Sequence, residues 1–185
     1  MKDRIEKAEV LLEALPYLQS FRGQTFLIKV GGSAMEEASL VDSLLRDIVF
    51  LEAVGINPVL VHGGGKAITK AMKEANLEAR FVAGLRVTDE KTIRIVEDTL
   101  SRVINPDLVQ RINTMGGRAV GLAGTSVFTG RRTKAQDPAS GELIAIGFIG
   151  EIVECSKEFV GLAVKGDVVP GGSPVATGIG PGPPP

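Results

Sequence analysis

Two glycine clusters, each directly after an apolar run, hold the residues best suited to chemistry. The first run, Phe26–Val30, ends at Gly31 and Gly32, and the second, Pro58–His62, ends at Gly63–Gly65. Glycine lets backbone N–H groups approach an anion closely, and a helix that begins there adds partial positive charge. Two such turns facing each other would receive anions from two sides, which favours transfer of a charged group between two ligands.

Lys29 lies inside the first apolar run, two residues before Gly31. A lysine in a buried strand is costly unless it has an anionic partner. We interpret Lys29 as a cation that reaches a phosphate held by the amides of Gly31 and Gly32, where it offsets charge on a transferred phosphoryl group. A structural salt bridge with an internal carboxylate is the alternative.

The second cluster is the candidate site for a substrate carboxylate. Gly64 and Gly65 supply amides, and Arg86 supplies a guanidinium that can hold a carboxylate through two bonds. A surface ion pair between Arg86 and Asp89 is the alternative. His62, the only histidine, is more typical of a packed, hydrogen-bonded residue than of a general base. No cluster of residues has metal-ligand spacing, so we predict no protein-bound metal.

Two common nucleotide motifs do not fit the second cluster. A P-loop would need glycine in place of Leu60 and a hydroxyl in place of Ala67. The dinucleotide pattern fails because Ile68 stands where its third glycine belongs.

The elements that position these residues alternate between strand and helix. Buried strands are predicted at 25–30, 58–62 and 118–122, with helices at 36–54 and 66–75, and this order favours an α/β fold with a parallel sheet. Further along we expect a hairpin at 80–88 that turns near Gly84, a helix from Thr88 to Val103, a helix opened by Asn105–Pro106, a long hairpin at 126–154, a helix at 156–164 and a strand from Val168.

The two ends of the chain are read separately from this core. An apolar stripe over 3–19 predicts a helix that Pro16 should end or kink, and residues 178–185 are too rich in glycine and proline for a helix or central strand. We therefore divide the chain into an N-terminal helix at 1–22, which can cover its own domain or reach another subunit, a ligand-binding domain at 23–178 and a disordered or aberrant tail at 179–185.

Composition limits the classes of partner. The 185 residues are 44% hydrophobic and 23% charged with a net charge of −1, so neither nucleic acid nor a membrane surface has electrostatic support as a partner. A single cysteine excludes an internal disulfide and fits a reducing compartment, which makes a cytoplasmic location the simplest expectation.

Taken together, the motifs resemble the amino acid kinase family, and within it the acetylglutamate kinases. The matching segments are Ile28–Met35, Val61–Gly65, Gly84–Asp89, Asn105–Asn113, Gly116–Gly121 and Ile146–Glu151, spread over about residues 8 to 178. The resemblance implies a three-layer α/β/α sandwich of the carbamate kinase-like type. It also implies transfer of the γ-phosphoryl group of ATP, with Mg²⁺, to the side-chain carboxylate of N-acetyl-L-glutamate in arginine biosynthesis.

Site roles follow from the same resemblance. Lys29 would stabilise the transferring phosphoryl group, and Gly31 and Gly32 would contact the nucleotide phosphates. Gly64, Gly65 and Arg86 would form the acetylglutamate site, with the 80–88 hairpin as a lid. Members of the family continue through an Asn-x-Asn-Ala-Asp segment into a nucleotide-binding half, so this chain is expected to be a truncated amino-terminal, substrate-binding half.

The resemblance also concerns assembly and regulation. An N-terminal helix of this kind marks hexameric, arginine-inhibited acetylglutamate kinases, so a homo-oligomer is implied, with Tyr17 near the inhibitor. Two alternatives stay open for the function: an amino acid kinase for glutamate, aspartate or an aminoadipate derivative, and a non-catalytic module for ligand binding or oligomerisation.

Overall fold

The computed structural model describes residues 2–138 and 140–179, and its centre is a four-stranded parallel sheet. The strands follow the order β1 (Thr25–Val30), β2 (Asn57–His62), β8 (Val169–Gly172) and β5 (Ala119–Leu122). All three pairings are parallel, which confirms the predicted α/β architecture. The carboxyl ends of all four strands therefore meet at one edge of the sheet.

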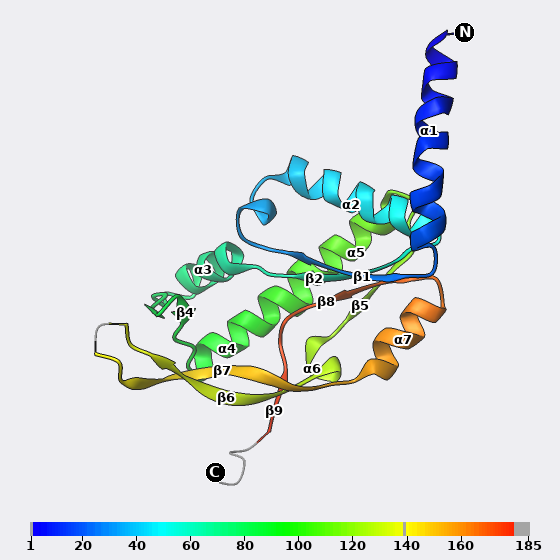
Figure 1. Ribbon diagram of the computed structural model, residues 1–185. Coiled ribbons are helices and arrows are strands. Elements are labelled where there is room, and N and C mark those ends of the chain that lie inside the picture. The colour runs from blue at the N-terminus through cyan, green and yellow to red at the C-terminus, as the bar shows by residue number, and fades with distance from the viewer. Residues whose placement is uncertain (1, 139, 180–185) are drawn as a thin grey trace.

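Helices cover the sheet unequally (Figure 1). On one side lie α2 (Ala38–Ala53), α3 (Gly65–Glu74) and α5 (Asn105–Thr114), and on the other side α7 (Lys157–Lys165) packs near β8. The core lies between the first group and the sheet, and fully buried members include Leu45, Ile48, Leu60 and Ile112. The helix predictions at 36–54 and 66–75 are confirmed to within a few residues.

The prediction that Thr25–Val30 is a buried strand is wrong in its burial. β1 has β2 as its only neighbour, and Leu27 on the face away from the core is 70% exposed. β5 at the opposite edge is also only partly covered. An apolar run predicts a strand, but the burial of that strand depends on which elements pack against it, and the run does not encode those elements.

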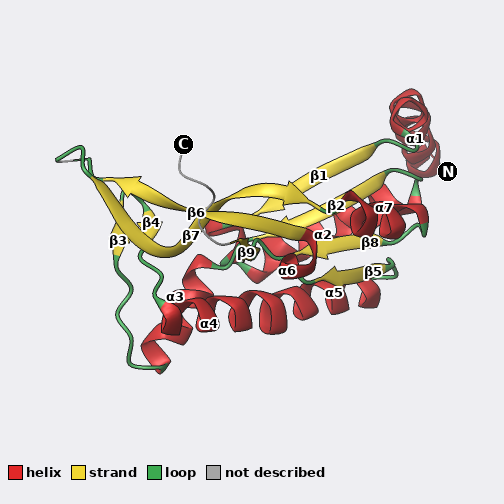
Figure 2. Cartoon of the chain, turned by 90° about the horizontal axis from the view of Figure 1, so that it is seen from below, coloured by secondary structure: helices red, strands yellow, loops and turns green. Residues whose placement is uncertain are grey.

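One long helical rod runs alongside β5 and β8 (Figure 2). It consists of α4 (Glu90–Glu97), a π-helical stretch at Asp98–Ile104 and then α5. Asn105 was expected to cap a new helix, but its backbone is helical (φ −59°, ψ −48°) and the rod continues through it. Its side chain donates instead to the carbonyls of Leu122 and Gly171, at 3.1 and 3.0 Å, and so fastens the rod to β5 and β8.

Two hairpins lie beyond the sheet. The short one, β3 (Phe81–Val82) and β4 (Leu85–Arg86), turns at Gly84 with φ +77°, as predicted. The long one, β6 (Phe128–Gln136) and β7 (Leu143–Cys155), confirms the predicted hairpin at 126–154. A four-residue helix, α6 (Gly124–Val127), and a short 3₁₀ turn at Gly32–Met35 complete the connections.

Two features of the chain ends bear on the predictions. α1 (Lys2–Phe21) includes Pro16, so the proline does not end the helix, which was one of its two predicted effects. Ile179, the first residue assigned to the tail, belongs to β9 (Thr177–Ile179), an edge strand parallel to β6. The rest of the predicted tail, 180–185, lies outside the described residues. No helix in the described part of the chain is long and apolar enough to cross a membrane.

Candidate functional site

The two glycine turns meet at the carboxyl edge of the sheet. The N–H of Gly63 donates to the carbonyl of Val30 at 2.7 Å, so the second turn is tied to the end of β1. A Cβ added at Gly63 would lie 3.6 Å from the Cα of Gly31, which is ordinary contact distance. The expectation that both turns end neighbouring parallel strands is confirmed. Ligands of open parallel sheets bind at this edge.

Within the described residues, three backbone N–H groups at this edge lack hydrogen-bond acceptors: those of Gly31 and Gly65, which are at least partly exposed, and that of Gly64, which is buried. Gly64 and Gly65 begin α3, whose dipole adds partial positive charge at that end. Gly32 has φ +61°, in the left-handed region that glycine adopts readily. The arrangement can bind anions from two loops at once.

Lys29 lies at the same edge, on the face of β1 opposite Ile28 and Val30. Lys29 is exposed, because β1 is an edge strand and this face of it is uncovered. The sequence argument that a buried Lys29 would need an anionic partner is therefore wrong. The alternative, a salt bridge with an internal carboxylate, is not formed by any described residue. Its ammonium group is therefore free to meet a ligand near Gly31.

Arg86 is brought directly to the start of α3. Its Nη2 donates to the Gly65 carbonyl at 3.0 Å and to Thr69 Oγ1 at 2.8 Å, and its Nη1 contacts Met72 Sδ at 3.1 Å. The guanidinium also lies 4.8 Å from the ring centre of Phe81. Burial lowers the pKa of Arg86 from its ordinary high value. The hairpin that carries Arg86 is thereby held against the second glycine turn.

The alternative ion pair between Arg86 and Asp89 does not form. The Asp89 carboxylate instead accepts a hydrogen bond from the N–H of Thr92 at 2.7 Å and caps α4. This bond holds the pKa of Asp89 below its usual value.

A further anchor of the short hairpin was missed from the sequence. Thr88 is buried, its N–H donates to the Ile146 carbonyl at 2.9 Å, and its own carbonyl accepts from the N–H of Phe148 at 2.7 Å. Gly147 between them has φ +83°, and a Cβ there would lie 2.0 Å from the Thr88 carbonyl oxygen. The glycine inside an apolar strand was the available signal, because such glycines mark close backbone approach.

The π-helical stretch supports the second turn from behind. A Cβ added at Gly64 would lie 2.5 Å from Ile104 Cδ1 and 2.7 Å from Leu100 Cδ2. A side chain at position 64 would therefore force Ile104 and Leu100 to shift, so glycine fits this close packing. Sequence patterns gave no signal for this contact, since π-helical geometry is not visible in the periodicity of the helix.

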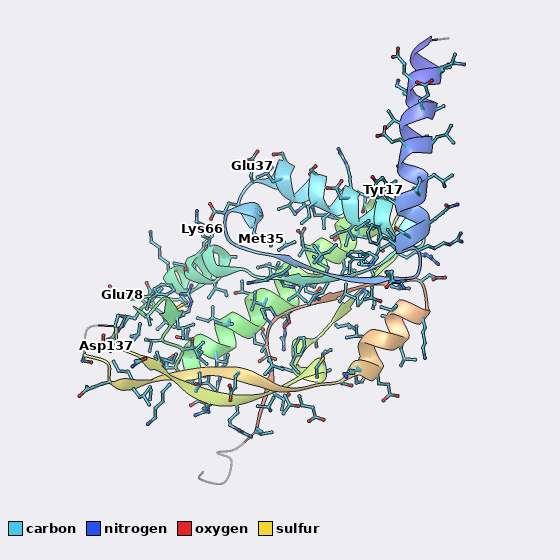
Figure 3. All side chains as sticks on the ribbon, in the orientation of Figure 1. Tyr17, Met35, Glu37, Lys66, Glu78 and Asp137 are labelled. Atoms are coloured by element: carbon cyan, nitrogen blue, oxygen red, sulfur yellow. The ribbon has the colours of Figure 1, made fainter. Side chains whose placement is uncertain are left out.

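One ion pair joins the two turns. Lys66, in the first turn of α3, donates to Glu36, which follows the first glycine turn. Tyr17 does not belong to this group: it lies on α1, is 66% exposed, and lies well to the right of Lys66 in Figure 3.

The site's donors suit a polyphosphate better than a metal ion. Free amides and a free ammonium group bind phosphate oxygens, while no described residues form a group of three carboxylate, histidine or cysteine side chains around a metal position.

Comparison with known proteins agrees with this geometry. The chain is 54% identical over 176 residues to the acetylglutamate kinase of Akkermansia muciniphila and 42% identical over 188 residues to that of Aquifex aeolicus. The alignments cover 95% and 96% of this chain but 59% and 63% of those proteins, so the chain spans about three-fifths of their length.

Solved structures share the fold at low sequence identity. N-acetylglutamate synthase from Neisseria gonorrhoeae, solved with coenzyme A and N-acetylglutamate, matches with a TM-score of 0.69 and 20% identity over 91% of this chain and 37% of its own. Giardia carbamate kinase matches with a TM-score of 0.55 and 12% identity, over 84% of this chain and 61% of its own. The amino acid kinase family matches residues 24–179, which contain the sheet, both glycine turns and the two hairpins. The chain belongs to the amino acid kinase family.

Proposed function

We propose that this chain forms the substrate- and phosphate-binding part of an acetylglutamate kinase, which transfers the γ-phosphoryl group of ATP to the side-chain carboxylate of N-acetyl-L-glutamate. The observation that carries the proposal is the meeting of two glycine turns whose amides at Gly31, Gly64 and Gly65 lack acceptors in the described chain. Transfer of a phosphoryl group from a phosphate to a carboxylate requires that the two anions are held side by side. Relatives named acetylglutamate kinase support the choice of substrate.

Each predicted residue has a chemical task in this proposal. The amides of Gly31 and Gly32 hold the phosphates, and Lys29 offsets the charge that spreads over the phosphoryl oxygens during transfer. The amides of Gly64 and Gly65 bind a carboxylate of the acyl amino acid. Arg86, fixed on the Gly65 carbonyl, completes this second subsite. Mg²⁺ carried by ATP supplies further neutralisation of the phosphate charge.

Calorimetric titration with N-acetyl-L-glutamate tests the second subsite without turnover. Arg86→Lys keeps the charge but loses the planar fork that reaches Gly65, Thr69 and Met72, so we expect at least about tenfold weaker binding. Arg94→Lys is the matched control, because Arg94 lies on the exposed surface of α4 and pairs with Glu90. Equal affinity of wild type and Arg86→Lys would remove Arg86 from the site.

A phosphoryl-transfer assay separates the kinase from the alternative of a non-catalytic module. The 185-residue chain is compared with a version extended to the length of its relatives, using glutamate, aspartate and N-acetyl-L-glutamate as acceptors. The proposal expects transfer to N-acetyl-L-glutamate by the extended protein. Transfer to another acceptor would identify a different amino acid kinase, and no transfer to any acceptor would favour the binding module.

We further propose that α1 joins copies of this chain into a larger homo-oligomer and that Tyr17 contacts a bound L-arginine. The support is the exposure of apolar side chains on α1: Val10, Leu11 and Leu12 are each about two-thirds exposed, and most of α1 projects from the rest of the molecule (Figure 1). An isolated helix gains stability by burying such side chains against another helix.

A further inference from the structure

His62 is an unusual residue for the end of a core strand. It is 1% exposed, and burial lowers the pKa of its imidazole, although the neighbouring Gly63 carbonyl opposes that shift. The ring is therefore neutral at pH 7. A buried polar ring is costly where an aliphatic side chain would fill the same space, so the presence of histidine here needs a reason.

The ring makes one hydrogen bond, and it is made to the glycine turn. Nδ1 lies 3.1 Å from the carbonyl oxygen of Gly63. Because a carbonyl oxygen only accepts, Nδ1 carries the proton of the neutral ring. Nε2 is buried and has no partner within the described residues. Nε2 thus lacks a hydrogen-bond partner among the described residues, while Nδ1 is bonded to the second glycine turn.

This bond sets the direction of a neighbouring amide. The Gly63 carbonyl and the Gly64 N–H belong to one planar trans peptide, so they point in opposite directions. The Gly63 N–H is fixed on Val30 at 2.7 Å, and Gly64 is backed by Ile104 and Leu100. With the carbonyl turned toward the ring, the Gly64 N–H points away from that ring, and although Gly64 is buried this N–H has no acceptor in the described chain.

We infer that His62 is a positioning residue, which aims the Gly64 N–H at the carboxylate of the acyl amino acid. The inference rests on the proposed function for the identity of that ligand. His62 itself does not touch the substrate and carries no proton in the reaction. Its role is to prevent the Gly63–Gly64 peptide from rotating, a freedom that glycine would otherwise allow.

Two substitutions separate positioning from packing. His62→Asn places a side-chain amide N–H near the position of Nδ1 but loses ring volume, whereas His62→Phe keeps a ring and loses the donor. Calorimetry with N-acetyl-L-glutamate is expected to show about tenfold weaker binding for His62→Phe and less than about threefold for His62→Asn. Leu60→Ala is the packing control, since Leu60 is equally buried on the same face of β2.

The opposite order of affinities, with His62→Asn binding more weakly than His62→Phe, would assign His62 a packing role and overturn the inference. Unchanged affinity in both variants would overturn it as well. Thermal unfolding of each variant reports whether the fold is retained.

A measurement on the wild-type chain decides the matter if the variants do not fold or if no ligand binds. His62 is the only histidine, so its ring nitrogens are assigned without ambiguity in a long-range ¹H–¹⁵N spectrum. A proton on Nδ1 supports the inference, and a proton on Nε2 overturns it. If wild type fails to bind N-acetyl-L-glutamate while Nδ1 is protonated, the proposed substrate is wrong and the role of His62 in fixing the turn stands.

Discussion

Lys29 has no ionic partner among the described residues and lies two residues before Gly31, so under the proposed function it serves chemistry more than folding. In a protein of the relatives' length, Lys29→Ala should lower kcat by roughly 10²-fold or more, a loss of about 3 kcal/mol of transition-state stabilisation. Steady-state kinetics measure this, with Lys70→Ala as control because Lys70 is 80% exposed on α3. An unchanged kcat with a raised KM for ATP would make Lys29 a ground-state contact only.

His62 should make stability depend on pH. Burial holds its pKa in the folded chain below the value of about 6.5 expected for an unfolded one. As pH falls through that value, the unfolded chain takes up a proton that the folded chain does not, so the free energy of unfolding decreases by up to about 1.4 kcal/mol per pH unit. The decrease ends once pH passes below the folded-state pKa.

Urea unfolding at pH values from about 7.5 to 5.5 measures this slope. His62→Phe has no such group, so its free energy of unfolding should change less over that range. An equal slope in wild type and variant would place the pH dependence elsewhere in the chain.

Among the elements, the π-helical stretch and the second glycine turn should be energetically coupled. Gly64→Ala puts a methyl group against Ile104 Cδ1 and Leu100 Cδ2, and such overpacking costs about 1–3 kcal/mol. Ile104→Val removes the Cδ1 atom, so the double variant should lose at least about 0.5 kcal/mol less than the sum of the single losses.

Chemical denaturation of the 185-residue chain measures all three variants. Gly65→Ala is the matched control, because a Cβ at Gly65 meets nothing within 4 Å. If the losses of unfolding free energy from Gly64→Ala and Ile104→Val were additive, the second glycine turn would move away from the helical rod without strain.

The elements show why sequence reasoning succeeded for some features and failed for others. Glycine clusters after apolar runs located both turns, because strand, turn and helix signals are local. The burial of β1 was misjudged, since an edge strand and a central strand share the same apolar pattern. The Asn105–Pro106 pair resembles a helix start, yet the side chain of Asn105 is used between β5 and β8, a contact across the fold.

The site shows the same division. The turns at Gly31 and at Gly64 and Gly65 were located because a glycine cluster directly after an apolar run marks the end of a strand. The contacts of Arg86 with α3 and of Thr88 with β7 depend on how hairpins fold back on the sheet. Single-sequence patterns carry no information about such distant pairings, so the means by which the short hairpin is held were visible only in the structure.

For the whole molecule, α1 poses the remaining question, because its contacts do not explain its apolar residues. Val10, Leu11 and Leu12 are 65–66% exposed, and the core sheet begins only at Thr25. Exposed apolar side chains on a projecting helix can be buried against the same helix of another copy, as in closed symmetric oligomers.

Deleting residues 1–21 from a protein of the relatives' length should therefore reduce a hexamer to dimers. Catalysis should be largely retained, because the glycine turns, Lys29 and Arg86 lie on the sheet and the short hairpin. Inhibition by L-arginine should weaken greatly, since the deletion removes Tyr17. Light scattering and inhibition assays measure both effects, with Leu143→Ser on the exposed part of the long hairpin as a control for loss of a surface apolar group. Hexamers that persist after the deletion would contradict the assembly role and leave α1 without a partner in the assembly.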